Sequence, residues 1–167
     1  MRLSQGVEWA LHACVDLSWL PPGTAVPVTR LAERFDLPGA YLNKHLQALA
    51  RGGVVTSRSG PRGGFLLARP AVEIAVLDVV DAIEGREPAF RCTEIRQQGA
   101  LPATRQMCQI PCQIASVMYG AEQAWRDHLA TVSIAAIADD VARAHPTVPD
   151  RVRAWYLPSE ATGAGRG

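Results

Sequence analysis

The sequence lacks any long apolar run. No segment reaches the roughly 18 consecutive apolar residues that identify a membrane-spanning helix. Near the N-terminus, Glu8, His12 and Asp16 interrupt the apolar core that a signal peptide would need. We therefore expect a cytoplasmic protein that has no membrane partner and whose thiols stay reduced.

The sequence also lacks the common signatures of an enzyme. It has no Cys-x-x-Cys pair, no glycine-rich phosphate-binding loop and no nucleophile beside a recognisable base. A thiol oxidoreductase that uses Cys108 and Cys112 is the enzyme alternative, and nothing else in the sequence supports it. We expect a protein that is not an enzyme and has no small-molecule substrate.

Cysteine is scarce, and its placement is informative. Of the four cysteines, Cys92, Cys108 and Cys112 fall in one segment, with fifteen residues in the first gap and three in the second. In a reducing compartment, grouped cysteines are more often metal ligands or redox centres than structural disulfides. Three intervening residues let two thiolates meet at one metal ion, so Cys108 and Cys112 form the stronger pair and Cys92 is a candidate third ligand. Free thiols or a transient disulfide are the alternative, and we expect Cys14, on an apolar helix face, to be buried.

The net charge of +1 is unevenly distributed. Residues 28–70 hold seven Lys and Arg against two Asp and Glu, so this segment carries +5 and the rest of the chain −4. A basic module attached to an acidic remainder is typical of a protein of which one part meets nucleic acid phosphates.

Apolar spacing predicts a mostly α fold. Helices are predicted over 5–20, 30–35 (capped by Thr29), 40–50, 76–84, 111–130 and, capped by Ser133, up to 144, with two strands over 54–57 and 65–67. One side of the first helix holds Val7, Ala10, Leu11, Cys14 and Leu17, which predicts a core face. A second side, with Glu8, His12, Val15 and Trp19, is expected to be covered by a partner chain. We divide the chain into residues 1–85, a loop at 86–111, a dimerisation helix and last helix at 112–149, and a flexible tail at 150–167.

Two helices, a turn and a basic hairpin make up a winged helix-turn-helix. In this motif the second helix enters the major groove, and Asn, Gln and Lys side chains read base edges there. The predicted DNA contacts on the helices are Arg30, Tyr41, Asn43, Lys44 and Gln47, and those on the glycine-rich wing are Arg58 and Arg62. A winged helix used only for protein contacts is the alternative, but the local charge favours DNA.

The chain resembles the IscR/NsrR regulators of the Rrf2 family over roughly residues 1–130. The resemblance is carried by Tyr41–Leu42, Gly53–Val55, the wing Gly63–Pro70, Glu73–Ile74 and Leu77–Gly85. It implies a symmetric homodimer, paired through the long helix, that binds a pseudo-palindromic double-stranded DNA operator. Many members carry an iron–sulfur cluster held by three cysteines, which are usually more evenly and more closely spaced than here.

The segment Gly6–His12 looks like the RsrR branch of this family. That resemblance implies a 2Fe–2S cluster held by Cys108 and Cys112 of one subunit and by Glu8 and His12 of the other, the last two being neighbours at i and i+4. Trp9, flanked by these ligands, is hypothesised to change rotamer with the charge of the cluster and to pass this motion to the recognition helix; core packing is the alternative role.

The expected function is therefore a redox-responsive DNA-binding regulator, predicted to be a repressor. Two alternatives of the same fold remain open. One is a nitric-oxide or iron sensor with a 4Fe–4S cluster that also uses Cys92, and the other is a regulator with zinc or no metal at the Cys/His site.

Overall fold

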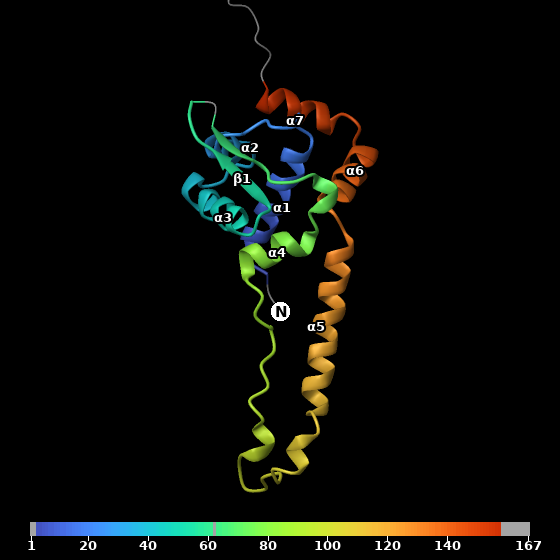
Figure 1. Cartoon of the computed structure of the whole chain (residues 1–167). Coiled ribbons are helices and arrows are strands. Elements are labelled where there is room, and N and C mark those ends of the chain that lie inside the picture. Colours follow the sequence, from blue (N-terminus) through green and yellow to red (C-terminus); the bar gives the residue numbers. More distant parts are fainter. Residues whose placement is uncertain (1–2, 62, 158–167) are drawn as a thin grey trace, which may run out of the picture.

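The computed structural model describes residues 3–61 and 63–157, and it divides into a helical body and an arm (Figure 1). The body contains α1 (Gln5–Ser18), α2 (Val28–Arg34), α3 (Gly39–Arg51), α4 (Val76–Glu84), α6 (Ile134–Ala144) and α7 (Val148–Tyr156). The arm consists of the loop after α4, with the short 3-10 helices η2 (Ile95–Gln97) and η3 (Met107–Gln109), and of α5 (Gln113–Thr131), which returns to the body. No helix in these described ranges is long and apolar enough to cross a membrane.

The core of the body surrounds α1. Ala10, Cys14 and Leu17 are buried, as the sequence predicted, and α3, α4 and α6 all pack on α1. Burial raises the pKa of the Cys14 thiol to about 12, because a thiolate there would lose its hydration. Cys14 is therefore an inert core residue.

The covering of the second side of α1 differs from the prediction. Val15 is only 6% exposed and belongs to the core of its own chain, and Trp19 packs partly buried against that core. Glu8 and His12, by contrast, are exposed. The chain thus covers half of this side by itself and leaves the polar half open to solvent.

The winged helix-turn-helix motif is present. Strands β1 (Val55–Arg58) and β2 (Gly64–Leu67) pair antiparallel, with Val55 opposite Leu67 and Arg58 opposite Gly64. Gly64 has φ +149°, and a Cβ there would overlap the backbone of Val26, whose own N–H and C=O bond to Phe65. Glycine is therefore required where the wing crosses the segment before α2.

Two helix starts show how local signals compete with tertiary structure. Ser133 caps α6 as predicted, its Oγ accepting the N–H of Ala136 at 3.1 Å. The predicted Thr29 cap is wrong: α2 begins two residues earlier than predicted, at Val28, with Pro27 at the cap position and no side-chain cap. The fixed φ of proline suits this position, and the carbonyl of Pro27 accepts the N–H groups of Arg30 and Leu31.

The prediction of a flexible tail after Pro149 is wrong for residues 150–156, which form most of α7. Pro149 lies in the first turn of α7, where the missing N–H has no helical partner to lose. Val152 is buried, and the Tyr156 hydroxyl donates a 3.0 Å hydrogen bond to the buried Asp16 carboxylate of α1. The rest of the predicted tail, 158–167, lies outside the described residues.

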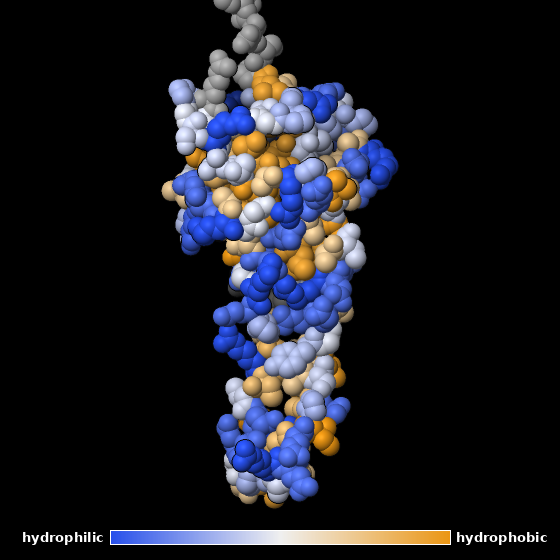
Figure 2. Space-filling model, in the orientation of Figure 1, coloured by the Kyte–Doolittle hydropathy of each residue, from blue (hydrophilic) through white to orange (hydrophobic). Residues whose placement is uncertain are grey.

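The arm is fixed to the body at its root and leaves apolar surface along its length. Trp125 packs with Val7, Val76 and Val80, and Arg126 forms a 2.8 Å ion pair with Asp81 of α4. Towards the far end of α5 the apolar side chains are uncovered: Ile114 and Val117 are each 70% exposed and Met118 is 42% exposed. The space-filling view shows apolar patches on the side of the arm where α5 runs (Figure 2).

Candidate functional site

The predicted base-reading residues lie on one face of α3. Leu42, Leu46 and Leu49 are fully buried, whereas most of the polar side chains of α3 are exposed. The exposed set contains Ala40, Tyr41, Asn43, Lys44 and Gln47. Because buried leucines fix the rotation of α3, its polar donors and acceptors face solvent, which is the arrangement that a recognition helix needs.

The other predicted DNA contacts are arranged differently. Arg58, at the end of β1 where the turn of the wing begins, donates a 2.9 Å hydrogen bond to the carbonyl of Gly23. Arg62 lies outside the described residues. Arg30 is engaged within the chain: it pairs with Glu33, donates to the carbonyl of Trp155 at 2.6 Å and stands 4.5 Å from the centre of the Trp155 ring. A DNA contact by Arg30 stays a prediction and would have to share a guanidinium that α7 already uses.

Trp9 connects α1 to the recognition helix. Its half-buried ring meets the rings of Tyr41 and His45 edge-on, at centroid distances of 6.2 Å and 5.9 Å. His45 was missed by the sequence reasoning, although its i, i+4 spacing from Tyr41 on one helix was a usable signal. Burial, followed by the positive charge of Lys44, lowers the pKa of His45. The fold therefore favours the neutral form of the His45 ring beside Trp9.

Glu8 and His12 also lie on α1 and are exposed. The His12 ring packs against Phe35, at the end of α2, with a centroid distance of 5.6 Å. Both proposed ligands thus lie on the surface of the body, and His12 lies next to the helix-turn-helix.

The cysteine pair lies at the opposite end of the arm. Cys108 is in η3, Cys112 immediately precedes α5, and both are half-buried. The 19 residues of α5 span roughly 28 Å at the usual helical rise. One chain therefore does not bring Cys108 and Cys112 to Glu8 and His12.

Local structure favours a thiolate at Cys112. The backbone N–H groups of Ala115 and Ile114, at the start of α5, together with the Arg96 guanidinium, lower the pKa of this thiol. Arg96 is held by Glu94 and donates to the carbonyl of Ile110, which lies between the two cysteines, at 3.3 Å. Sequence reasoning missed Arg96; a Glu-x-Arg pair inside the cysteine segment was the available signal.

Cys92 is exposed and stands apart from this pair. Its backbone N–H lies 3.4 Å from the hydroxyl of Tyr119, two helical turns along α5 from Cys112. The outgoing loop is held to α5 nearby, where the rings of Phe90 and Tyr119 meet at 5.7 Å.

The donor set fits a shared metal centre better than a complete single-chain site. Within residues 3–61 and 63–157, no group of three or more His, Cys, Asp or Glu side chains is placed to hold a metal ion. Cys108 and Cys112 supply two closely spaced sulfur donors, one of them favoured as thiolate, so they fit half of a four-ligand iron–sulfur site. The remaining ligands must come from elsewhere, and Glu8 and His12 are an exposed carboxylate and imidazole on another surface.

Comparison with known proteins adds a family. Residues 3–140 match the Rrf2 family, described as an iron-dependent transcriptional regulator. YwgB of Bacillus subtilis (strain 168), whose name describes an HTH-type transcriptional regulator, is 26% identical over 94% of this chain and 96% of its own length. The HTH-type transcriptional regulator IscR of Escherichia coli is 34% identical over 55% of this chain, and the match spans 57% of IscR.

Solved structures support the same fold. The IscR structure from T. potens superimposes with a TM-score of 0.62 at 22% identity, covering 87% of this chain and 91% of that one. The oxidised form of CymR from Staphylococcus aureus gives a TM-score of 0.60 at 21% identity, covering 83% of this chain and 96% of CymR. These likenesses confirm the predicted mostly α, winged-helix fold.

Proposed function

This chain belongs to the Rrf2 family of DNA-binding transcriptional regulators, and from that premise we propose that it is a redox-responsive repressor of the RsrR type that shares 2Fe–2S clusters between two copies of itself. Cys108 and Cys112 of one copy and Glu8 and His12 of the other would hold each cluster. The family match and relatives that are regulators agree with the expectation that the chain is not an enzyme.

The observation that carries the proposal is the separation of the two half-sites. The cysteine pair is at the tip of the arm, while the carboxylate and imidazole are exposed on the body. In a two-fold symmetric dimer, the cysteine pair of each copy can meet the carboxylate and imidazole of the other copy. Each of the two sites then has four ligands.

The uncovered face of α5 supports a homodimer. Ile114, Val117 and Met118 form one helical stripe of exposed apolar side chains. Pairing this stripe with its copy would bury it and would carry each arm towards the partner's body. A two-fold dimer presents two α3 helices, which is why we expect a pseudo-palindromic operator.

The residues around the site suit a redox sensor. An iron–sulfur cluster supplies one-electron chemistry, and replacing thiolate ligands with imidazole raises its reduction potential. Arg96 places a positive charge beside the cysteine pair and stabilises the loop by a hydrogen bond to the carbonyl of Ile110. His12 contacts Phe35 of the DNA-binding motif, and Trp9 contacts the recognition helix. The part of α1 that carries the proposed ligands therefore contacts both the end of α2 and α3.

Anaerobic purification followed by iron, sulfide and zinc analysis tests this assignment. We expect a coloured protein with equal iron and sulfide, loss of both in His12→Ala, and retention of both in Cys92→Ala. Loss of the cluster in Cys92→Ala with retention in His12→Ala would support the 4Fe–4S alternative, an iron or nitric-oxide sensor. A colourless protein containing zinc would contradict the redox assignment.

A further inference from the structure

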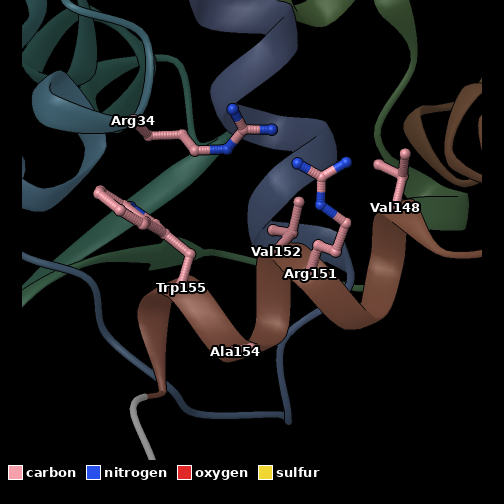
Figure 3. A pocket seen from close by; sticks show the side chains of 6 residues that line it. All are labelled: Arg34, Val148, Arg151, Val152, Ala154 and Trp155. Atoms are coloured by element: carbon pink, nitrogen blue, oxygen red, sulfur yellow. The ribbon is translucent and has the colours of Figure 1, made fainter.

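A pocket lies between α2 and α7, at the end of the body away from the arm (Figure 3). Its volume is about 490 Å³, within the usual range of small-molecule sites. It is lined by Arg34 of α2 and by Val148, Arg151, Val152, Ala154 and Trp155 of α7. The cysteine loop and the recognition face contribute no lining residue to it.

The polar groups of this pocket are two guanidiniums. Figure 3 shows Arg34 and Arg151 reaching towards one another from α2 and α7. Two like charges directed into one space repel each other, and an anion between them would replace this repulsion by two attractions. Guanidinium groups also match carboxylate oxygens with paired hydrogen bonds.

The surrounding contacts hold Arg34 in place while leaving it able to bind a ligand. Its Nε lies 3.4 Å from Asp16 Oδ2, and its guanidinium stands 4.9 Å from the centre of the Phe35 ring. The contact with Asp16 is through Nε, and within the described part of the chain neither Nη group of Arg34 makes a hydrogen bond. In the described part of the chain the neighbouring cations Arg30 and Arg153 have carboxylate partners in Glu33 and Asp150, whereas Arg151 has none.

The rest of the wall is apolar. Val152 is only 2% exposed and forms the floor, and the Trp155 ring is 38% exposed. A flat apolar body placed against valine and indole surfaces would lose its contact with water at the same time as its charge meets the two arginines.

We propose that this pocket binds a small organic anion, a carboxylate carrying an aromatic or similarly flat apolar body, as an effector of the regulator. The site lies against α2, the first helix of the DNA-binding motif, and shares Arg34 with the Asp16–Tyr156 contact that holds α7 in place. It is a separate site from the proposed cluster, because none of its lining residues belongs to the proposed ligand set.

The test is isothermal titration of the full chain with 2-naphthoate. The uncharged 2-naphthamide and inorganic phosphate serve as comparison ligands. We expect saturable binding of 2-naphthoate, one molecule per chain, and no comparable binding of the amide or of phosphate. Replacing Arg151 by Gln should weaken 2-naphthoate binding about tenfold or more, the effect of losing one charge-assisted hydrogen bond.

Arg143→Gln is the matched control, because Arg143 is an exposed arginine of α6 that pairs with Asp140 and lies outside the pocket. Equal binding in wild type and Arg143→Gln, with weaker binding in Arg151→Gln, supports the proposal. It is overturned if 2-naphthoate shows no saturable binding at millimolar concentration or binds Arg151→Gln as it binds wild type. It is also overturned if phosphate alone binds, or if Arg151→Gln weakens operator binding without ligand, since the site would then meet DNA phosphates.

Discussion

Trp9 is the residue through which the proposed ligand face of α1 touches the recognition helix. It stands between Glu8 and the rest of the helix in sequence, and its ring contacts Tyr41 and His45 of α3. A change in the orientation of this ring would alter the contacts between α1 and α3. The core would stay folded, because other residues form the buried face of α1.

We therefore predict that Trp9→Ala keeps the cluster but uncouples it from DNA. Oxidised and reduced protein should bind the operator with equal affinity, measured by fluorescence anisotropy on labelled operator DNA at fixed salt. Tyr41→Phe, which keeps the second ring of the contact, is the control and should retain the redox effect. A redox effect of wild-type size in Trp9→Ala would show that Trp9 is only a packing residue.

His45 gives a pH dependence of stability with a defined sign. Its pKa is lowered in the folded chain, by burial first and by Lys44 second, so the folded state favours the neutral ring. The unfolded state then binds more protons just below the ordinary histidine pKa of about 6.5, and the free energy of unfolding falls as the pH drops through this range.

Urea unfolding at a series of pH values from about 7.5 down to about 5.5 measures this effect. Wild type should lose stability towards acid, and His45→Gln should show a smaller loss over the same interval because the titrating ring is gone. An unchanged slope in His45→Gln would assign the pH dependence to other groups.

At the scale of elements, α7 ties the end of the described chain to its beginning. The Tyr156 hydroxyl donates to Asp16, and burial of the tyrosine together with the nearby carboxylate raises its pKa. Asp16 is 4% exposed, so its carboxylate depends on Tyr156 and Arg34 for partners.

Tyr156→Phe should lower the free energy of unfolding by about 1–3 kcal/mol, because a buried carboxylate loses a hydrogen-bond donor while the ring packing is kept. Chemical denaturation checks this value. Tyr41→Phe, on the exposed face of α3, is the matched control and should change stability by less than about 0.5 kcal/mol. An equally small effect in Tyr156→Phe would mean that water replaces the lost donor.

Helix α5 carries the second prediction at this scale. A charge placed in its exposed apolar stripe by Val117→Asp should raise the dimer dissociation constant by about a hundredfold or more, since the carboxylate would be buried opposite its own copy. Sedimentation velocity measures the shift to monomer. Ser116→Asp adds the same charge at the neighbouring position, on the opposite side of α5, and should leave the dimer intact. Monomers in both variants, or in neither, would place the dimer contact elsewhere.

Elements with strong local signals were predictable from sequence, and those stabilised by distant contacts were not. Residues 76–84 and the Ser133 cap follow from periodicity and cap chemistry, and the structure reproduces both. Helix α7 was missed because the C-terminal segment as a whole is rich in Gly, Ala and Pro, while α7 is held by contacts with residues more than a hundred positions away. The cysteine pair could be found from spacing, but Arg96 beside it required the loop geometry.

At the scale of the whole molecule, the length of the arm separates the cysteine pair from the DNA-binding motif. The body carries the recognition helix, the wing and the exposed Glu8 and His12, whereas the tip of the arm carries Cys108 and Cys112. In the proposed dimer each cluster would join one chain's arm to the other chain's body. A change in cluster charge would then act on the relative placement of the two recognition helices.

A mixed dimer tests this claim most directly. One chain carries Cys108→Ala and Cys112→Ala, the other carries Glu8→Ala and His12→Ala, and different affinity tags allow the mixed dimer to be isolated anaerobically. Each doubly substituted homodimer should be colourless. The mixed dimer should contain half the iron and sulfide of wild type, because one intact ligand set is rebuilt across its two chains. A mixed dimer as colourless as the two homodimers would contradict the shared site.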